Sequence, residues 1–371
     1  MIKLLVLQPK ANDGVSWYRI VQFANYANEH KLLDIRFLDP NKFSVETITQ
    51  LIHSADVFWA RAKIDSGFIE FLKTKPKNKP VIVDLDDNLH LINPLSDMYQ
   101  FLGTKNIKLP DGRWLWKDGE KGFSIDKNKL RLKAIEKSLQ MASVVTTTTE
   151  KMKMYLNNFN DNVIVVPNCI NPKVFPYLNI KRNDKTIRVG YALGSSHYED
   201  LMSILPSLVR IVKKYPNVKY YHIGQWFGVV SKYIPKDKLV KYGWINADGH
   251  GYRMATMGLD IGICSLSNHE FNSYKSSIKF YEYSATKTAT LAKESLPYME
   301  DITDGVNGSL YYSADDFEKR LEELIINKQK RVKIANKAYD YVMKYRTIER
   351  IAPDWVKMIK LLHKTYESIA V

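Results

Sequence analysis

Short runs of apolar residues alternate with longer stretches that are apolar on one face only, and this pattern continues through most of the chain. In the first half, the runs with the length and β-branched content of strands are residues 3–7, 34–38, 57–60, 81–84, 144–147 and 163–166. Stretches with helical spacing lie between them, notably 18–29, 45–52, 67–73 and 129–140. Strands that alternate with helices predict a parallel sheet with helices on its faces.

A second series begins after NPKVFPYLNIKRNDK, a stretch containing Pro and Asn that is typical of an interdomain connection. Its strand candidates are residues 187–191, 218–223, 239–242, 261–264, 288–292 and 309–312. The pattern therefore predicts an α/β protein with two Rossmann-like, doubly wound domains. The final stretch, 346–369, has apolar residues at helical spacing and is expected to cross back onto the first domain.

The length agrees with two domains, because 371 residues are more than one hydrophobic core usually carries. We expect the first domain over residues 1–180, the second over 181–345 and the returning helix over 346–371. One segment, 102–125, interrupts the α/β rhythm with Gly, Pro, Asp and two Trp residues, and it resembles an insertion into the first domain.

Composition and net charge bear on where the protein is located and on which partners it binds. The only cysteines, Cys169 and Cys264, lie in apolar surroundings and are expected to be reduced, which suits a cytoplasmic protein. The apolar start, MIKLLVL, is too short for a signal peptide, and no run approaches the length of a membrane helix. A net charge of +15 favours polyanionic partners, so contact with the inner face of a membrane stays open.

The densest chemistry lies in residues 272–308, NSYKSSIKFYEYSATKTATLAKESLPYMEDITDGVNG. Ser276 and Ser277 are expected to cap a helix whose N-terminal N–H groups attract phosphate, while Lys275 and Lys279 add positive charge. Glu282, about one and a half turns further on, has a carboxylate suited to a ribose diol. The segment predicts a site for a nucleotide.

The order of Lys-Ser, Lys, Glu-Tyr, Leu-Pro-Tyr and Asp-Gly-Val-Asn-Gly in this segment resembles the donor-binding half of retaining glycosyltransferases of the GT-B fold. The likeness is to the glycosyltransferase family 4 type, in its polysaccharide-synthesis and bacteriophage branch. IRVGYALGSSHYEDL, VIVDLDDNLH, and SVVTTTTEKMKMYL followed by VIVVPNCINPKVF resemble the same family. The resemblance implies two domains facing across a cleft, a nucleoside diphosphate sugar as donor, and no metal or other cofactor.

The donor residues that the resemblance implies depart from the usual pattern at two places. Tyr274 stands where the family has a second Glu, eight positions before Glu282. The usual Arg and Lys after the first strand of the second domain are replaced by Gly194, Ser195, Ser196 and His197. Hydroxyls, backbone N–H groups and an imidazolium would then bind phosphate, helped by Lys275 or Lys279. Gly14 and Arg19, from the loop after the first strand, are assigned to the donor as well.

Asp84, Asp86, Asp87 and His90 form the main polar cluster of the first domain. The resemblance places this segment near the acceptor hydroxyl, where Asp86, Asp87 or His90 would act as the general base. Two alternatives stay open. The Asp-Leu-Asp sequence could bind a divalent ion, as in glycosyltransferases of the GT-A fold, or these Asp residues could cap the next turn.

Trp114 and Trp116, within the insertion, stand beside basic residues and are candidates for stacking on the acceptor. A hairpin that buries both rings is the alternative. We expect retaining transfer of a sugar to a hydroxyl of a saccharide or lipid-linked glycan. A hydroxymethylated base in DNA, as modified by some bacteriophage enzymes, and a non-catalytic protein that binds a nucleotide sugar are the other hypotheses; sequence leaves the oligomeric state open.

Overall fold

The computed structural model describes residues 1–62, 66–182 and 184–368, and it divides the chain into two compact units. Unit 1 comprises Met1–Pro94, Met98–Pro167 and Ile348–Val371, and unit 2 comprises Leu95–Asp97 and Asn168–Thr347. Apart from Leu95–Asp97, the chain passes into unit 2 after Pro167, before the boundary at residue 180 expected from the sequence, and returns to unit 1 at Ile348.

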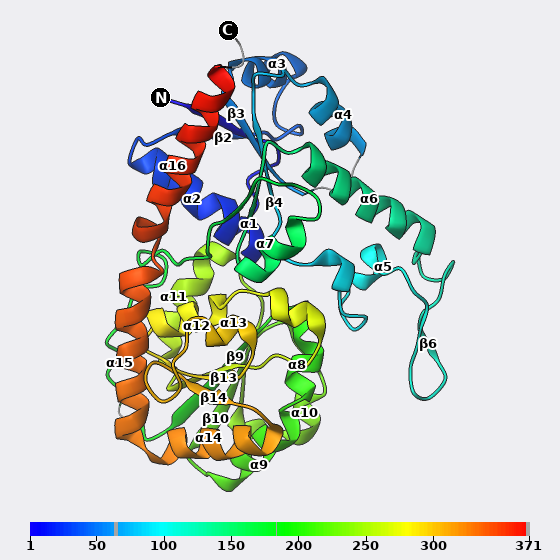
Figure 1. Cartoon of the computed structure of the whole chain (residues 1–371). Helices are drawn as coiled ribbons and strands as arrows, with labels where there is room; N and C mark the ends of the chain where they lie inside the picture. The colour runs from blue at the N-terminus through cyan, green and yellow to red at the C-terminus, as the bar shows by residue number, and fades with distance from the viewer. Residues whose placement is uncertain (63–65, 183, 369–371) are drawn as a thin grey trace. The chain divides into compact units, whose positions relative to one another are not determined.

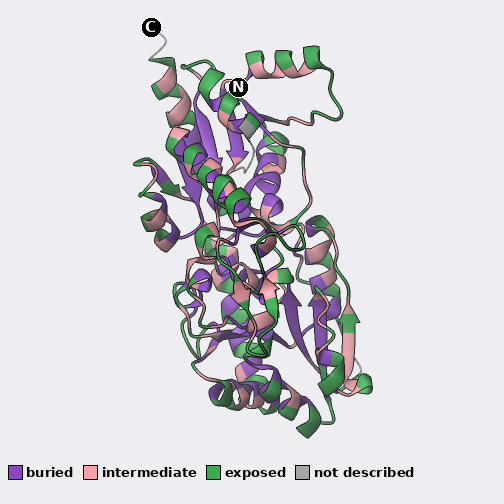
Figure 2. Ribbon diagram, turned by 90° about the vertical axis from the view of Figure 1, so that its right-hand side faces the viewer, coloured by how far each residue is buried: buried purple, intermediate pink, exposed green. Residues whose placement is uncertain are grey.

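Unit 1 is built on a parallel sheet with the strand order β2-β1-β3-β4-β7-β8. Its strands are β1 (Lys3–Val6), β2 (Asp34–Phe37), β3 (Val57–Arg61), β4 (Val81–Asp84), β7 (Val144–Thr147) and β8 (Val163–Val165). The central strands are buried along their length, because helices cover both faces of the sheet (Figures 1 and 2). The strands predicted from the apolar runs are confirmed.

The helices of unit 1 are α1 (Gly14–Ser16), a π-helical turn η1 (Trp17–Val21), α2 (Gln22–Glu29), α3 (Val45–Ser54), α4 (Ser66–Thr74), η2 (Leu89–Leu91), α5 (Tyr99–Leu102), α6 (Ile125–Met141), α7 (Glu150–Leu156) and α16 (Ile348–Glu367). Helix α16 packs on α2, and α4 packs on α6. Trp355 of α16 packs its ring against Trp59 of β3 at 4.7 Å between centroids. The predicted return of the last helix to the first domain is therefore present.

The insertion between β4 and α6 forms α5 and a hairpin of β5 (Ile107–Lys108) and β6 (Trp114–Trp116). Figure 1 shows the hairpin projecting from the N-terminal end of α6. Its base is held by Trp116, whose ring packs on those of Tyr99 and Phe123 and whose Nε1 donates to the carbonyl of Pro94 at 2.7 Å. These contacts hold the base of the hairpin.

Unit 2 repeats the architecture with a parallel sheet in the order β11-β10-β9-β12-β13-β14. The strands are β9 (Ile187–Leu193), β10 (Val218–Gly224), β11 (Leu239–Tyr242), β12 (Ile261–Cys264), β13 (Ala289–Lys293) and β14 (Ser309–Tyr311). The helices are η3 (Ser195–His197), α8 (Tyr198–Met202), α9 (Leu205–Lys214), α10 (Val230–Tyr233), η4 (Lys236–Lys238), α11 (Ala247–Met257), η5 (Glu270–Tyr274), α12 (Ile278–Ala285), α13 (Leu296–Met299), α14 (Ala314–Ile326) and α15 (Lys328–Tyr345).

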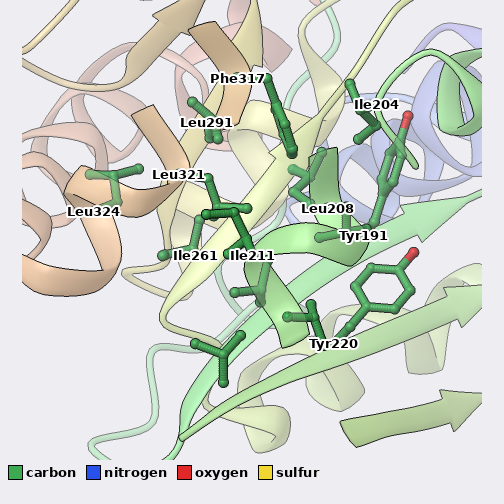
Figure 3. Packing of buried hydrophobic residues seen from close by; sticks show 14 of the residues in the cluster. Tyr191, Ile204, Leu208, Ile211, Tyr220, Ile261, Leu291, Phe317, Leu321 and Leu324 are labelled. Carbon is green, nitrogen blue, oxygen red and sulfur yellow. The ribbon is translucent and has the colours of Figure 1, made fainter. Parts of the chain in front are cut away.

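The core of unit 2 joins one face of the sheet to α9 and α14 (Figure 3). Leu208 and Ile211 of α9 and Phe317 and Leu321 of α14 are at most 1% exposed. Such close packing fixes the carboxyl ends of β9 and β12, from which the candidate site is built. Within the described residues no helix is long and apolar enough to cross a bilayer.

One glycine is required by the backbone beside that site. Gly224, which ends β10, has φ +93°, and a Cβ placed there would lie 2.4 Å from the carbonyl oxygen of Leu193. A side chain at this position would clash with the end of β9 in a conformation that L-residues avoid. The turn therefore needs glycine.

Candidate active site

The main candidate site lies where the strand order of unit 2 changes direction. From β9 the chain proceeds to β10 on one side, whereas β12 lies on the other side of β9. Ligands of open α/β sheets bind outside the carboxyl ends of strands at such a switch point. Here β9 leads to Gly194 and Ser195–His197, and β12 leads through η5 to Lys275 and α12. The structure thus brings together two of the sequence-predicted segments.

A chain of hydrogen bonds joins these segments. His197, 6% exposed, binds the Asp200 carboxylate through Nδ1 at 2.6 Å, and its Nε2 lies 2.8 Å from Nζ of Lys279. The other carboxylate oxygen of Asp200 accepts from the backbone N–H of Ser267 at 2.6 Å and from Nδ2 of Asn272 at 3.0 Å. Asp200 therefore orients the imidazole, and the imidazole orients the Lys279 ammonium.

Burial and neighbouring charges determine the protonation of His197 and Lys279 in this chain of hydrogen bonds. Burial, together with the nearby Lys279, lowers the pKa of His197 to about 4. The neutral ring donates a hydrogen bond from Nδ1–H to Asp200 and accepts one at Nε2 from the Lys279 ammonium. Only the tautomer protonated at Nδ1 satisfies both contacts. Burial also lowers the pKa of Lys279, an effect opposed by the Glu282 carboxylate. The expectation of an imidazolium at His197 is wrong, because a buried ring beside a lysine does not retain a second proton.

The start of α12 differs from the predicted serine caps. Ser277 occupies the position before the helix, but its hydroxyl donates to the carbonyl of Pro297. The hydroxyl of Ser276 accepts from Nδ2 of Asn168 at 2.8 Å. In the described structure no side chain caps α12, so its first N–H groups are not occupied by a capping oxygen. Lys275, just before them, lies over the Phe271 ring at 4.5 Å.

Glu282 projects from the same helix and is 7% exposed. One carboxylate oxygen lies 3.5 Å from Nε2 of His250, which comes from α11. Tyr274 occupies the last position of η5. Sequence reasoning missed Asp200, Asn272 and His250, although Asp200 follows His197 by three residues, a spacing that places two side chains on one face of a helical turn.

A second polar cluster lies at the carboxyl ends of the strands of unit 1. Asp84 ends β4 and is fully buried, and its carboxylate accepts from Nη2 of Arg19 at 2.8 Å and from the Thr146 hydroxyl at 2.7 Å. The Arg19 guanidinium also donates to the carbonyl of Val166 and lies over the ring of Trp355 at 5.6 Å. Arg19 was predicted to contact the donor; at 1% exposure it is instead an interior partner of Asp84.

Asp86 lies beyond this ion pair, with its side chain 14% exposed and 3.4 Å from Nη2 of Arg61. Burial and the nearby carboxylates of Asp87 and Asp84 raise the pKa of Asp86 to about 6, although Arg61 opposes the shift. His90 binds Glu136 through Nε2 at 2.8 Å and the hydroxyl of Tyr155 through Nδ1. The raised pKa of the Asp86 carboxyl is closer to neutrality than that of an ordinary aspartate.

The remaining sequence candidates are more exposed. Gly14 begins α1 after Asp13, whose carboxylate caps the turn by accepting from Ser16 N–H, and a Cβ at Gly14 would meet nothing within 4 Å. Trp114 is 41% exposed with Nζ of Lys108 4.4 Å above its ring, whereas Trp116 packs into the base of the hairpin. Only one of the two rings is thus presented to a ligand. Within the described residues, no group of three or more His, Cys, Asp or Glu could hold a metal ion.

No protein family and no curated protein matches the sequence, whereas solved structures match it over almost its whole length. Sucrose-phosphate synthase from Thermosynechococcus elongatus has a TM-score of 0.67 and 13% identity, covering 98% of this chain and 100% of its own. HepE from Anabaena in complex with UDP-glucose has a TM-score of 0.64 and 14% identity, covering 97% and 100%.

A glycosyltransferase from Rickettsia africae has a TM-score of 0.64 and 12% identity, covering 97% of this chain and 98% of its own. The likeness extends over both units of this chain, with their two six-stranded parallel sheets, and over its C-terminal helices. At these identities the likeness shows the fold. The chain has the GT-B fold.

Proposed function

We propose that this protein is a glycosyltransferase that uses a nucleoside diphosphate sugar as donor and binds it in unit 2. The observation that carries the proposal is the grouping of Lys275, Lys279 and Glu282 around the start of α12, at the switch point of the sheet. Two ammonium groups and uncapped helix N–H groups suit a diphosphate, and the carboxylate of Glu282 suits a ribose diol. HepE, of the same fold, was solved with UDP-glucose.

Charge stabilisation would be the main catalytic task of this site. When the bond between the sugar and the diphosphate breaks, negative charge develops on the leaving phosphate oxygen, and preorganised ammonium and N–H groups stabilise it. Lys279 is suited to this role because His197 and Asp200 hold it in one orientation. Ser195 and Ser196, in the turn after β9, would add hydroxyl and backbone N–H donors. The transfer is retaining, with the acceptor attacking the face from which the diphosphate leaves, and no metal takes part.

Residues of unit 1 would bind the acceptor and accept its proton. Asp86, with a pKa of about 6, is suited to accept a proton from an attacking hydroxyl near neutral pH. His90 is less suited, because Glu136 and Tyr155 occupy both of its ring nitrogens. The acceptor that we propose is a hydroxyl of a saccharide or lipid-linked glycan.

Glu282→Ala tests the donor assignment. Loss of charged hydrogen bonds to the ribose should lower kcat/KM for the donor by about 10- to 150-fold, equivalent to about 1.5–3 kcal/mol, while the fold is retained. The matched control is Glu294→Ala, which removes an exposed carboxylate next to β13. A folded Glu282→Ala protein with wild-type kinetics would show that the donor binds elsewhere.

The acceptor is tested by incubating the protein with labelled UDP-glucose, or other labelled nucleotide sugars, and one of three acceptors. These are soluble oligosaccharides, a lipid-linked glycan, and duplex DNA with hydroxymethylated bases. Transfer to either glycan supports the proposal, whereas transfer to DNA alone would replace it with a DNA-modifying function. Donor binding without any transfer or hydrolysis would indicate a non-catalytic binding protein.

A further inference from the structure

The exposed face of α6 carries an unusual combination of charge and apolar surface. Lys127, Lys129, Lys133 and Lys137 are exposed, and no ion pair is found for them in the described part of the chain. Leu130 lies among them and is 66% exposed. Leu130, Lys133 and Lys137 follow at intervals of three and four residues, so they lie along one side of the helix. Figure 2 shows the side of the molecule that carries α6 in Figure 1.

Two further apolar rings stand on the elements next to α6. Phe101 of α5 is 41% exposed, and the guanidinium of Arg131 of α6 lies over its ring at 5.5 Å. Trp114 of the hairpin is equally exposed beneath the ammonium of Lys108. Each exposed ring is thus paired with a cation, which suits a boundary between water and an apolar phase.

The acidic groups of the hairpin do not offset this charge. Asp111 binds Arg113 at 2.6 Å, and Glu120 binds Lys117 at 2.6 Å. The Asp118 carboxylate accepts from the backbone N–H of Ile125. Among the described residues no ion pair is found for Asp118 or for the exposed Asp126 of α6, but the four exposed lysines of α6 outnumber these two carboxylates. The surface formed by α6, α5 and the hairpin, here called the α6 surface, therefore keeps an excess of lysine together with Leu130, Phe101 and Trp114.

We propose that the α6 surface docks on an anionic lipid bilayer. Lysines near such a bilayer are attracted by its negative potential, and Leu, Phe and Trp gain by entering the interfacial region. A nucleic acid fits less well, because Leu130 would have no partner on a phosphate backbone. The arginines of this surface are also engaged, Arg113 by Asp111 and Arg131 by Asn128 and the carbonyl of Phe101. The inference does not depend on sugar transfer.

Co-sedimentation of the full chain with vesicles tests this inference. Vesicles of phosphatidylglycerol and phosphatidylcholine should bind the protein, and vesicles of phosphatidylcholine alone should bind it much more weakly, with binding reduced by salt. The triple variant Lys129→Gln, Lys133→Gln and Lys137→Gln should bind about a hundredfold more weakly, at roughly fivefold per lysine. The control triple variant Lys213→Gln, Lys219→Gln and Lys232→Gln removes the same charge from unit 2 and should bind like the wild type.

The apolar contribution is tested separately. Leu130→Ser should weaken vesicle binding by about tenfold, whereas Leu361→Ser, at a position of α16 that is 64% exposed, should not. Equal losses from both triple variants would show that binding follows net charge and not the α6 surface, and would overturn the proposal. Retention by duplex DNA but not by anionic vesicles would overturn it in favour of a nucleic-acid partner.

Discussion

Asp200→Asn removes one charge from a buried carboxylate and changes the shape of the side chain very little. In the wild type, one oxygen of Asp200 accepts from Ser267 N–H and Asn272 Nδ2, and the other accepts from His197 Nδ1. An amide oxygen can keep the first two contacts, which turns the amide NH2 towards His197. The ring must then accept at Nδ1 and carry its proton on Nε2, where it faces the Lys279 ammonium.

The expected loss of activity follows from this arrangement, in which Nε2–H of His197 and the Lys279 ammonium are both donors and face each other. Either Lys279 loses its hydrogen bond to the ring or it loses its proton, and a hydrogen bond to a charged group contributes about 1.5–3 kcal/mol. We therefore expect kcat/KM for the nucleotide sugar to fall by about 10- to 150-fold, although Asp200 itself does not contact the donor. Donor kinetics, a melting curve, and the ¹⁵N shifts of the His197 ring would be measured together.

Asp184→Asn is the matched control, because it removes a carboxylate from an exposed ion pair with Arg188 on the same unit. It should leave donor kinetics unchanged. If Asp200→Asn folds, keeps the wild-type ring tautomer and has kcat/KM within about twofold of the wild type, then the chain from Asp200 through His197 to Lys279 does not position the lysine.

Other consequences of the structure can be measured independently. The pKa of His197 is about 4 in the folded protein and 6.5 in the unfolded chain, so the unfolded chain binds a proton at higher pH than the folded protein does. The free energy of unfolding should therefore fall as the pH drops from about 6.5 to 4. His197→Gln should reduce this pH dependence, as measured by urea titrations. Arg19→Leu leaves the buried charge of Asp84 unpaired and should destabilise unit 1 by about 3–5 kcal/mol, with partial recovery when Asp84→Leu is added. Gly224→Ala should cost about 1–3 kcal/mol, seen as a lower denaturant midpoint, because its Cβ meets the Leu193 carbonyl. Sugar transfer should persist in excess chelator; complete loss, reversed by Mn²⁺ or Mg²⁺, would contradict a metal-free diphosphate site.

The strands and the two sheets could be predicted because they depend on local patterns. Apolar runs between amphipathic stretches specify βαβ units wherever they occur. The helix that carries Glu282 was expected from Ser276 and Ser277 as caps, and it is present although no side chain of the described residues caps it. For the insertion, the sequence predicted a break in the rhythm and, as one alternative, a hairpin that buries both Trp rings. The different burial of Trp114 and Trp116 depends on whether each ring reaches Tyr99 and Phe123.

The errors concern contacts between residues that are distant in sequence. Arg19 and Asp84 are 65 residues apart, and no local pattern shows that the guanidinium will form an ion pair with that carboxylate. Ser277 was expected to cap α12, but the Pro297 carbonyl, 20 residues further on, accepts its proton instead. The charge assigned to His197 was wrong because burial, which sets its pKa, is a property of the folded chain.

The central claim, that unit 2 binds a nucleotide sugar, is tested most directly by thermal unfolding of the full chain with a panel of nucleotide sugars that includes UDP-glucose. A ligand at 100 times its Kd should stabilise the protein by about 2.7 kcal/mol and raise Tm by about 5–10 °C. We expect at least one nucleotide sugar to do so, and Glu282→Ala to reduce the shift at the same concentration. Absence of a shift with every nucleotide sugar, or an unchanged shift in Glu282→Ala, would contradict the proposed donor site.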